Sequence, residues 1–472
     1  MSLVLANNVG ALNARNNLTR SSTSLNKSIE RLSSGFKINR GADGPAALVI
    51  SEKQRAQIAG LRQAISNTEK AVTVVQTAEG ALNEINSILV KVRSLALDSA
   101  NAGVNDTDAF AANQAEIDNA LDTINRIASN TQFGEKALLD GSAGLVGTPD
   151  DADVTFLKGT SDTTAGTYAV AVTTAAARAT ASGTAQTGTL AADEVLTING
   201  VSITLNAGTT QDGVVARINE FSSLTGVTAE DDPSTATVTR LRSTEFGADA
   251  EISVVSDTAA ATTSSGFGTT LTSANGTNIA GTINGAAASG QGNILTSTAG
   301  NSKGVAVRIA ANASNLVETV TGAQGNVAIT DNSLVFQIGA NQNQTAKIAI
   351  ADVAADSLGL GVTGVRFNSL NDIDVTSADK AQETLKVIDS AIDELSNIRG
   401  ALGAFQTNTL ESIANNLRNT LENTVNAESV IRDTDFAEEI SKFTNNQILV
   451  QAGTSVLSSA NQTNQAVLSL LQ

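Results

Sequence analysis

The stretch VVQTAEGALNEINSILVKVRSL, residues 74–95, decides the fold of this chain because its apolar residues repeat at helical spacing. Positions 74, 78, 81, 85, 88, 92 and 95 are Val, Ala, Ala, Ile, Ile, Val and Leu, in alternating steps of four and three. Such a repeat places one narrow apolar stripe along a helix, as in coiled coils. The segment from Ala46 to about Asn101 is therefore predicted to be a long helix that packs against other helices.

The N-terminal segment carries the same kind of stripe. Its members are Leu5, Val9, Leu12, Leu18, Leu25, Ile29 and Leu32. This first helix should end near Gly35, since Gly is a common helix terminator, and Pro45 suits the first turn of the next helix. After a turn at 102–106, another helix should begin with Asp106 or Thr107 as its cap.

Helical patterning returns near Ser377 and continues to the end of the chain. The last segment, which follows Asp433-Thr434-Asp435, has apolar and small residues in steps of four and three: Val456, Ala460, Thr463, Val467 and Leu470. This spacing matches the seam of the first helix. We therefore predict a discontinuous helical coiled-coil core that is made from both chain ends.

The middle of the chain has a different texture. Residues from about 141 to 375 are rich in Gly, Thr, Ser and Ala and contain strand-like alternations. Asn199-Gly200 separates two such alternations, which is a strong hairpin signal. A second strand pair is expected at 334–338 and 346–350. The fold class is thus α + β and multidomain, with a β-rich outer region inserted between the helical ends.

Composition excludes several kinds of chemistry. The chain has 472 residues with no His, no Cys and no Trp, and its formal net charge is −18. Without His and Cys there is no Ser-His-Asp or Cys-His catalysis, no disulfide and no zinc site of the usual ligands. The motif at Gly359–Gly364 fits G-x-G-x-x-G but lacks the strand–turn–helix setting of a nucleotide site. We predict no enzyme activity, no cofactor and no metal, and the acidic charge argues against nucleic acid as a partner.

Charge favours pairing of the two ends. Residues 1–62 hold nine Lys/Arg and three Asp/Glu, whereas residues 376–440 hold five Lys/Arg and twelve Asp/Glu. Each exposed ion pair contributes only ~0–1 kcal/mol. The opposite local charges nevertheless favour association of these distant segments.

The terminal helices are too weakly apolar to be stable alone. A fully buried Leu or Ile contributes about 1.5–3 kcal/mol, and each terminal helix offers only a few, among many Asn, Ser and Thr. We infer that neighbouring copies of the chain complete these stripes in a polymer. An ordinary two-helix appendage docked on its own globule is the alternative.

Several motifs at both ends resemble those of bacterial flagellin, the subunit of the flagellar filament. They are Asn16–Leu18, Ile29–Gly35, Ile38-Asn39, Gln76–Asn86, Val92-Arg93, Leu95-Ala96, Ser99–Asn101 and Thr131–Phe133 near the N-terminus, and Asp433–Ala437, Gly453–Leu457 and Val467–Leu471 near the C-terminus. The matching regions cover roughly 1–140 and 376–472. Residues 193–258 also look like a repeat found in flagellin and hook-associated proteins.

The resemblance implies concentric layers with these boundaries: 1–40 and 433–472 as the inner coiled coil, 41–140 and 331–432 (with its β-hairpin) as the two halves of the helical core, and 141–330 as the outer region. The inner-tube residues would be Leu5, Val9, Leu12, Leu25, Ile29, Leu32, Val456, Val467 and Leu470.

The resemblance also implies a structural function and a set of partners. The chain would self-assemble into the extracellular filament used for swimming. It would be exported by the flagellar type III apparatus without a cleaved signal peptide, which fits a start at Met1–Asn8 with no cationic or long apolar run, and no segment is apolar enough to span a membrane. A secretion chaperone, a filament cap and hook-associated junction proteins would be its partners.

Some flagellins are sensed by an innate immune receptor through one helical segment. The corresponding residues here are Leu89, Lys91, Arg93 and Leu95, with support from Glu116. Val90, Lys91 and Ser94 stand where stimulating flagellins have Gln, Arg and Glu, and Lys lacks the planar fork of Arg. The expected receptor contact is therefore weakened, and the same residues would equally serve as filament contacts.

Two other functions remain open from sequence. A hook–filament junction protein shares the terminal helices, and a surface adhesin or glycan-binding protein would use residues 141–330 as its binding module. The absence of long filaments from the pure protein would favour the junction protein, and glycan binding by the outer region would favour the adhesin.

Overall fold

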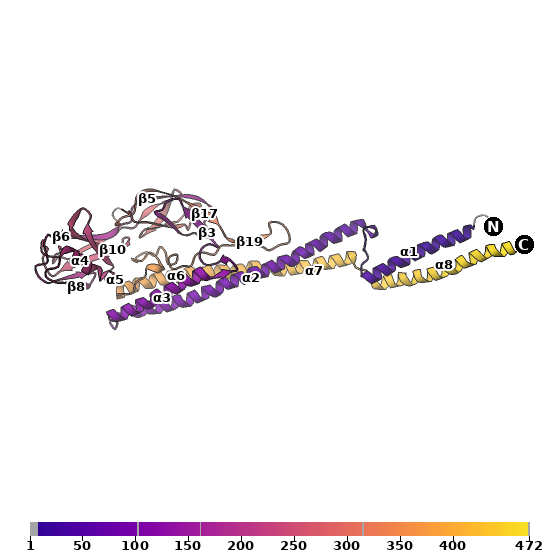
Figure 1. The fold of residues 1–472 in the computed structure, drawn as a ribbon, viewed down its shortest axis with the longest axis horizontal. Helices are drawn as coiled ribbons and strands as arrows, with labels where there is room; N and C mark the ends of the chain where they lie inside the picture. The colour runs from indigo at the N-terminus through magenta and orange to yellow at the C-terminus, as the bar shows by residue number, and fades with distance from the viewer. Residues whose placement is uncertain (1–7, 102, 161, 314–315, 471–472) are drawn as a thin grey trace. The chain divides into compact units, whose positions relative to one another are not determined.

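The computed structural model describes residues 8–101, 103–160, 162–313 and 316–470, with side chains described up to residue 462. The chain divides into two compact units. Unit 1 comprises Met1–Glu69, Gln337–Thr345 and Glu411–Gln472, and unit 2 comprises Lys70–Phe336 and Ala346–Leu410. The predicted α + β class, with helices at both ends and strands between them, is confirmed (Figure 1).

The helices of unit 1 come from both chain ends. They are α1 (Val9–Ser34), the first part of α2 (Pro45–Ser99), α7 (Ser412–Arg432) and α8 (Phe436–Leu470), with a 3-10 turn η1 (Gly41–Asp43) before α2. Asn8 caps α1 by accepting a hydrogen bond from the Ala11 amide at 2.8 Å. Gly35 ends this helix with a φ of 76°, which places the residue in the left-handed region that favours Gly. The predicted helix end at Gly35 and helix start at Pro45 are both confirmed.

The second part of α2 packs with α3 (Thr107–Asn130) and α6 (Ala378–Ala404) in unit 2. Asp106 caps α3 as predicted, accepting from the Ala109 amide at 2.9 Å. The stripe predicted for 74–95 overlaps the buried face of α2 but is displaced slightly around the helix. Its small or half-buried members Ala81, Ile88 and Leu95 flank the fully buried residues, which include Leu82, Ile85, Leu89, Val92 and Ala96.

Between α6 and α7 the helix widens into a π-helix, η4 (Phe405–Glu411). Leu395, Leu402, Leu410 and Leu417 are buried along this continuous helical run. The step from Leu402 to Leu410 is eight residues, whereas the steps on either side of it are seven. The wider turn thus accommodates one extra residue.

An eight-stranded antiparallel sheet forms the larger part of the β-rich region. Its order is β3 (Leu145–Pro149), β17 (Gly322–Asp331), β5 (Gly166–Thr174), β13 (Ala280–Ile283), β14 (Ala286–Gln291), β15 (Ile294–Ser297), β16 (Ala306–Ile309) and β4 (Val154–Lys158). One face buries a core that includes Tyr168, Val307 and Ile329. The sheet curves until its edge strands approach, with the Phe156 ring of β4 lying against Gly147 of β3, where a Cβ atom would fall 2.3 Å from the ring.

A second β-rich body, which we call the outer module, comprises residues 178–275. It contains a three-stranded sheet of β6 (Arg178–Ala185), β10 (Thr235–Phe246) and β9 (Val227–Asp232), and a four-stranded sheet of β12 (Thr272–Asn275), β11 (Glu251–Ser256), β7 (Glu194–Ile198) and β8 (Val201–Leu205), with α4 (Gln211–Asn219) and α5 (Ser222–Thr225). These elements enclose their own apolar core. The predicted hairpin is confirmed: β7 and β8 pair through Asn199-Gly200, whose φ values are 48° and 81°.

Short elements complete the fold. They are β1 (Gln132–Phe133) paired with β2 (Lys136–Ala137), β18 (Leu334–Gln337) paired with β19 (Thr345–Ile348), and the 3-10 turns η2 (Gly300–Ser302) and η3 (Leu370–Asp372). The β18–β19 pair overlaps the two strands predicted at 334–338 and 346–350, with β19 beginning one residue earlier. Within unit 1, Ala340 between these strands packs against Gly60 of α2, where an added Cβ would lie 3.1 Å from the Ala340 Cβ.

Candidate assembly surface

The helices α1 and α8 lie side by side (Figure 1). On α8, the residues that are buried or half-buried recur in steps of four and three: Glu439, Phe443, Asn446, Val450, Gly453, Leu457 and Ala460. Gly453 allows the closest approach, since a Cβ there would lie 3.3 Å from Leu18 Cδ1 on α1. The two chain ends therefore form a coiled-coil pair, whose α8 seam includes the predicted Ala460 but not the predicted Val456.

The structure divides the predicted inner-tube residues between two faces. Leu25 and Leu32 are half-buried on the face of α1 that carries Leu18, because steps of seven keep one face. The side chains of Val9, Leu12, Ile29 and Val456 are exposed. Leu5 lies outside the described residues, and the side chains of Val467 and Leu470 do too.

A break in spacing explains why Val9 and Leu12 differ from Leu25 and Leu32. From Leu12 to Leu18 the step is six residues, which turns the helix by about 240° away from the earlier direction. Val9 and Leu12 consequently face away from α8, while Leu18, Leu25 and Leu32 face it. Val9 and Leu12 thus belong to one apolar stripe of α1, and Leu18, Leu25 and Leu32 belong to another.

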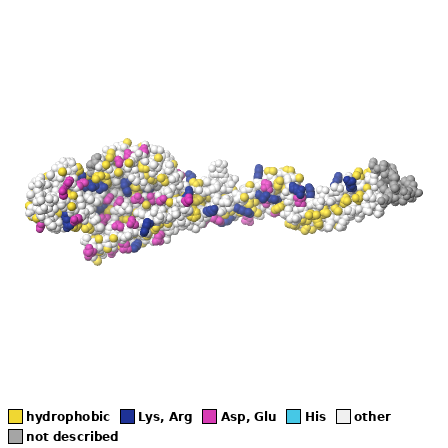
Figure 2. Space-filling model, viewed as in Figure 1, with side chains coloured by type: hydrophobic (Ala, Val, Ile, Leu, Met, Phe, Trp, Pro, Cys, Tyr) yellow, Lys and Arg dark blue, Asp and Glu magenta, His cyan; other side chains and the backbone are white. Residues whose placement is uncertain are grey.

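The helix α8 also carries large apolar side chains that are exposed. Phe436, Ile440, Ile448, Leu449 and Val456 are each more than half exposed, and they point in several directions because a helix turns by about 100° per residue. Figure 2 shows apolar side chains gathered along this terminal helix pair. These exposed apolar side chains are available to pack against another surface, because α1 covers only one side of α8.

One ion pair crosses the seam of the two helices. Arg31 Nη1 lies 3.6 Å from Glu439 Oε2, and the Glu439 side chain is almost fully buried. This contact joins the basic N-terminal segment to the acidic C-terminal one, in the direction that the sequence charge indicates. It also accounts for a carboxylate at a seam position where an apolar residue would be expected.

A short backbone bridge joins the two linkers next to this helix pair. The Lys37 amide donates to the Arg432 carbonyl at 2.6 Å, and the Thr434 amide donates to the Gly35 carbonyl at 2.9 Å. The Arg432 guanidinium lies over the Phe36 ring, 4.3 Å from its centroid. This cation–π contact and the two hydrogen bonds hold the C-terminal end of α1 next to the C-terminal end of α7.

The residues considered for receptor contact lie on α2 and α3. Lys91 Nζ forms an ion pair with Glu116 Oε1 at 2.6 Å, and Arg93 Nε forms one with Asp389 Oδ1 at 2.7 Å. The hydrogen bond to Asp389 raises the pKa of Arg93 above its ordinary value. Leu89 is fully buried and Leu95 is half-buried. The charged members of the set are therefore at the surface, while Leu89 belongs to the helical core.

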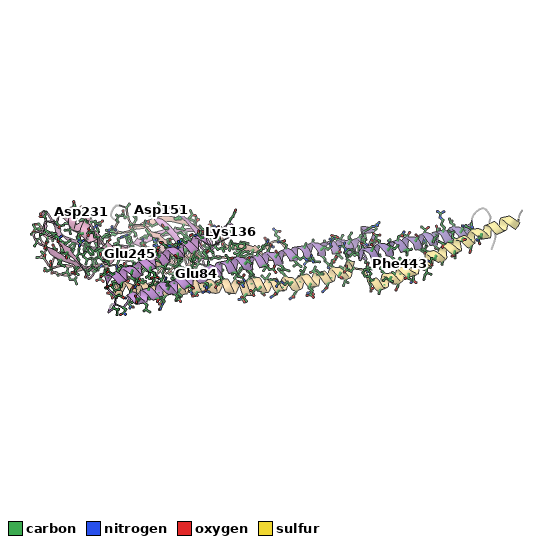
Figure 3. All side chains as sticks on the ribbon, turned by 60° about the horizontal axis from the view of Figure 1, so that its bottom comes forward. Glu84, Lys136, Asp151, Asp231, Glu245 and Phe443 are labelled. Atoms are coloured by element: carbon green, nitrogen blue, oxygen red, sulfur yellow. The ribbon has the colours of Figure 1, made fainter. Side chains whose placement is uncertain are left out.

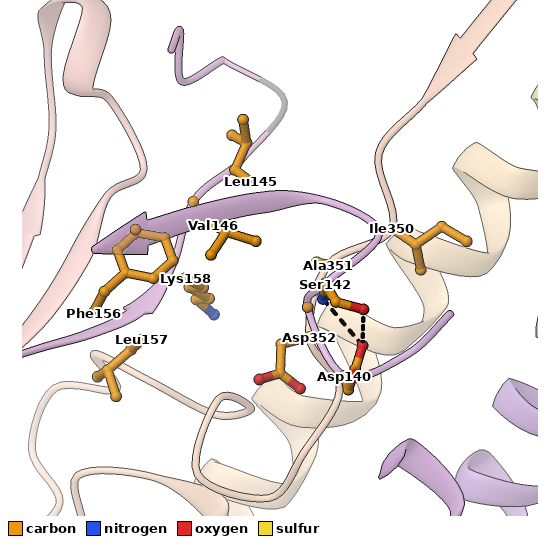
Figure 4. Close-up of a pocket in the computed structure, with 13 residues that line it drawn as sticks. Asp140, Ser142, Leu145, Val146, Phe156, Leu157, Lys158, Ile350, Ala351 and Asp352 are labelled. Atoms are coloured by element: carbon orange, nitrogen blue, oxygen red, sulfur yellow. Dashed lines mark hydrogen bonds between the residues drawn. The ribbon is translucent and has the colours of Figure 1, made fainter. Parts of the chain in front are cut away.

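A pocket of about 300 Å³ lies between β3, β4 and residues 350–352 (Figure 4). Its two carboxylates already have partners: Asp140 accepts from the amide and hydroxyl of Ser142, and Asp352 accepts from the Ala354 amide and the Ser357 hydroxyl. Burial raises the pKa of Asp352 above its ordinary value. These groups shape loops and do not form a nucleophile–base pair.

Two kinds of site are absent from the described part of the chain. No group of three His, Cys, Asp or Glu residues there could hold a metal ion. No helix there is long and apolar enough to cross a bilayer.

The two chain ends form a helical pair with uncovered apolar faces, and a β-rich outer region is inserted between them. These features define a structural subunit that packs against copies of itself. Residues 5–144 match the bacterial flagellin N-terminal helical region, and residues 385–471 match the bacterial flagellin C-terminal helical region. The chain belongs to the bacterial flagellin family, whose members are structural subunits of the flagellar filament.

Full-length relatives support this assignment. A flagellin of Clostridium tyrobutyricum is 33% identical over 98% of this chain and 100% of its own length. The B-type flagellin of Pseudomonas aeruginosa is 33% identical, and a flagellin of Salmonella typhimurium is 31% identical, each over 100% of both chains. The solved structure of FliC from Burkholderia pseudomallei covers 71% of this chain and 98% of its own, with 16% identity and a TM-score of 0.24. The assignment therefore rests on the sequence relatives, and they favour a filament subunit over a junction protein or an adhesin.

Proposed function

We propose that this chain polymerises through α1 and α8, which form the inner layer of an extracellular flagellar filament. The observation that carries the proposal is the apolar surface of α8, which α1 covers on one side only while Ile448, Leu449 and Val456 stay exposed. Burial of such side chains is favourable. A second copy of the chain supplies a surface of the same chemistry, so assembly removes the uncovered faces from water.

The remaining layers follow the chain order. Residues 1–40 and 433–472 form the inner coiled coil, residues 41–140 and 331–432 form the next helical layer, and residues 141–330 form the outer region. The family membership and the helical ends support this layering. The inner-tube set is proposed to comprise the residues deduced from sequence: Leu25 and Leu32 face α8, and the exposed Val9, Leu12, Ile29 and Val456 meet other copies.

Export and assembly partners follow from the same membership. We expect export by the flagellar type III apparatus without a cleaved signal peptide, a secretion chaperone that holds the last helix, a cap that guides insertion, and hook-associated junction proteins at the filament base. The absence of Cys supports export of an unfolded chain because no disulfide has to be broken.

An innate immune receptor is a further proposed partner, with weakened recognition. Lys91 and Arg93 are both held in ion pairs on the exposed helical surface. A receptor would have to compete with Glu116 and Asp389 for these two cations. Reporter cells should respond less to this protein than to a stimulating flagellin at equal concentration, and an equal response would contradict the proposal.

Truncation tests the polymerisation proposal. A chain limited to residues 46–432 lacks α1 and α8 and should keep its helical and β-rich circular dichroism spectrum while remaining unpolymerised in sedimentation. Filaments formed by this truncated chain at the concentration that suffices for the full chain would overturn the proposal.

A further inference from the structure

The outer module has a core of its own. Leu196, Ile203, Ile218 and Leu241 are fully buried within it, apart from the core of the eight-stranded sheet. One residue of the module, Phe246 at the end of β10, packs into the core of that sheet. The module is therefore a separate packing body, with one apolar anchor in the neighbouring sheet.

The contacts between the module and the helical part of unit 2 are polar. Lys380, in the first turn of α6, is 4% exposed. Its Nζ donates to the carbonyls of Ser223 and Leu224 in the module, at 3.3 and 3.2 Å, and to Asp374 Oδ2 at 2.7 Å. A buried ammonium thus holds the carbonyls of α5, where a positive charge is favourable.

A second set of contacts surrounds Glu245, which is labelled in Figure 3. Asn368 Nδ2 donates to Glu245 Oε2 at 3.1 Å, and Gln291 Nε2 bridges Asp249 Oδ2 and the Val365 carbonyl, each at 3.1 Å. These contacts and those of Lys380 line or adjoin a cavity of about 70 Å³. We call this region the polar junction. Most of the residues that line its cavity are polar, and the cavity has room for water.

Two carboxyl groups, those of Glu245 and Asp372, line the same cavity of the polar junction. Burial and the charge of Asp372 on η3 raise the pKa of Glu245 to about 7, while Arg178 of β6, the Asn368 amide and Arg308 of β16 act in the opposite direction. Burial also raises the pKa of Asp372, against a hydrogen bond from Ser369 and the charge of Arg308.

The other charged groups around the cavity are divided between both signs. They are Glu251 of β11, Asp374 and Arg366 of the segment before α6, and Lys380 of α6, with Asp249 beside them. Most of these charges are already paired: Arg366 binds Glu383 at 2.9 Å, and Lys380 binds Asp374. Glu245 is therefore the group whose ionisation changes the net charge of the junction near neutral pH.

We propose that the polar junction is a pH-operated latch, which holds the outer module against the segment before α6 while Glu245 is protonated and releases it when Glu245 and Asp372 are both ionised. Protonated Glu245 is neutral and can stay in the buried cavity beside Asp372. Ionisation places two like charges in a poorly hydrated space, and separation of the module lets water reach them. The module would consequently be held rigidly in mildly acidic surroundings and be mobile in alkaline ones.

Spin labels can measure this directly because the chain contains no native Cys. Ser234 of the module and Asn83 of α2 are exposed positions within unit 2, and the full chain with Ser234→Cys and Asn83→Cys would carry one label at each. Pulsed electron–electron distance measurements should give a narrow distribution at about pH 5.5 and a broad one at about pH 8.5. The monomer suffices for this measurement, so its outcome is independent of polymerisation.

Variants identify the groups responsible. Glu245→Gln mimics the protonated side chain and should keep the distribution narrow at both pH values, and Asp372→Asn should do the same by removing the repulsion. Glu84→Gln, at an exposed position of α2, is the matched control and should still broaden at high pH. Circular dichroism confirms that each variant is folded. The proposal is overturned if the wild-type distribution is the same at both pH values, or if either junction variant broadens as the wild type does.

Discussion

Replacing Ile448 and Val456 with Ala should weaken polymerisation and leave the folded subunit intact. Both side chains are 57% exposed in the single chain. Full burial of such a side chain is worth about 1.5–3 kcal/mol, so the exposed part of each contributes about 1 kcal/mol when another copy covers it. The double variant should lose about 2 kcal/mol per subunit in the polymer, which corresponds to an about 30-fold higher critical concentration.

Sedimentation of purified subunits over a range of concentrations measures this change, and thermal melting by circular dichroism measures the fold. Ser458→Ala, at an exposed polar position of α8, should change neither quantity. Leu417→Ala, at a buried position of α7, should instead destabilise unit 1 by about 2–5 kcal/mol. If the Ile448/Val456 double variant polymerises at the wild-type concentration, the uncovered faces of α8 do not meet another copy and the reasoning fails.

Three further changes test other parts of the fold. Because the pKa of Glu245 is raised from 4.5 to about 7, unit 2 should lose up to about 3 kcal/mol of stability as the pH rises between those values; urea unfolding should show this slope, and Glu245→Gln should abolish it. Gly453→Val should push α8 away from Leu18 and speed hydrogen exchange in α1 and α8 alone; unchanged exchange would contradict the close approach. Arg432→Met removes the cation over Phe36 and should weaken the linker bridge by about 1–2 kcal/mol, seen as faster exchange of the Lys37 amide; equal exchange rates would show that the backbone bonds suffice.

Local signals in the sequence predicted local structure well. Gly35 and Pro45 mark a helix end and a helix start because each acts through its own backbone dihedral angles. Asn199-Gly200 specifies its hairpin for the same reason, and Asp106 caps α3 through a bond to an amide three residues away. Such features need no information about the rest of the chain.

Faces and distant contacts were harder to predict. The sequence pattern predicts Val456 and Ala460 on the seam of α8, whereas the structure keeps Ala460 there, exposes Val456 and places Leu457 toward α1. A helix with large apolar side chains in several directions offers more than one stripe at the same spacing, and periodicity cannot choose among them. The seam does have a signal, since steps of four and three run from Glu439 through Gly453, but it includes a charged residue and a Gly.

The polar junction and the linker bridge had no sequence signal. Lys380 lies more than 150 residues from the carbonyls that it binds, and Phe36 lies almost 400 residues from Arg432. A single Lys or Arg in a helix is usually solvated, so burial is what distinguishes these two. Only the folded structure shows which Lys and Arg side chains are buried.

The π-helix at Phe405–Glu411 gives an insertion or deletion of one residue at that turn a defined structural effect. One residue more or less rotates everything downstream about the helix axis by about 100°. Deleting one residue there would let the turn close into an ordinary α-helix, while the eight-residue step from Leu402 to Leu410 would shorten to seven. The helix itself would therefore tolerate the deletion. Side chains after the deletion would lose those contacts that depend on their position around and along the helix axis.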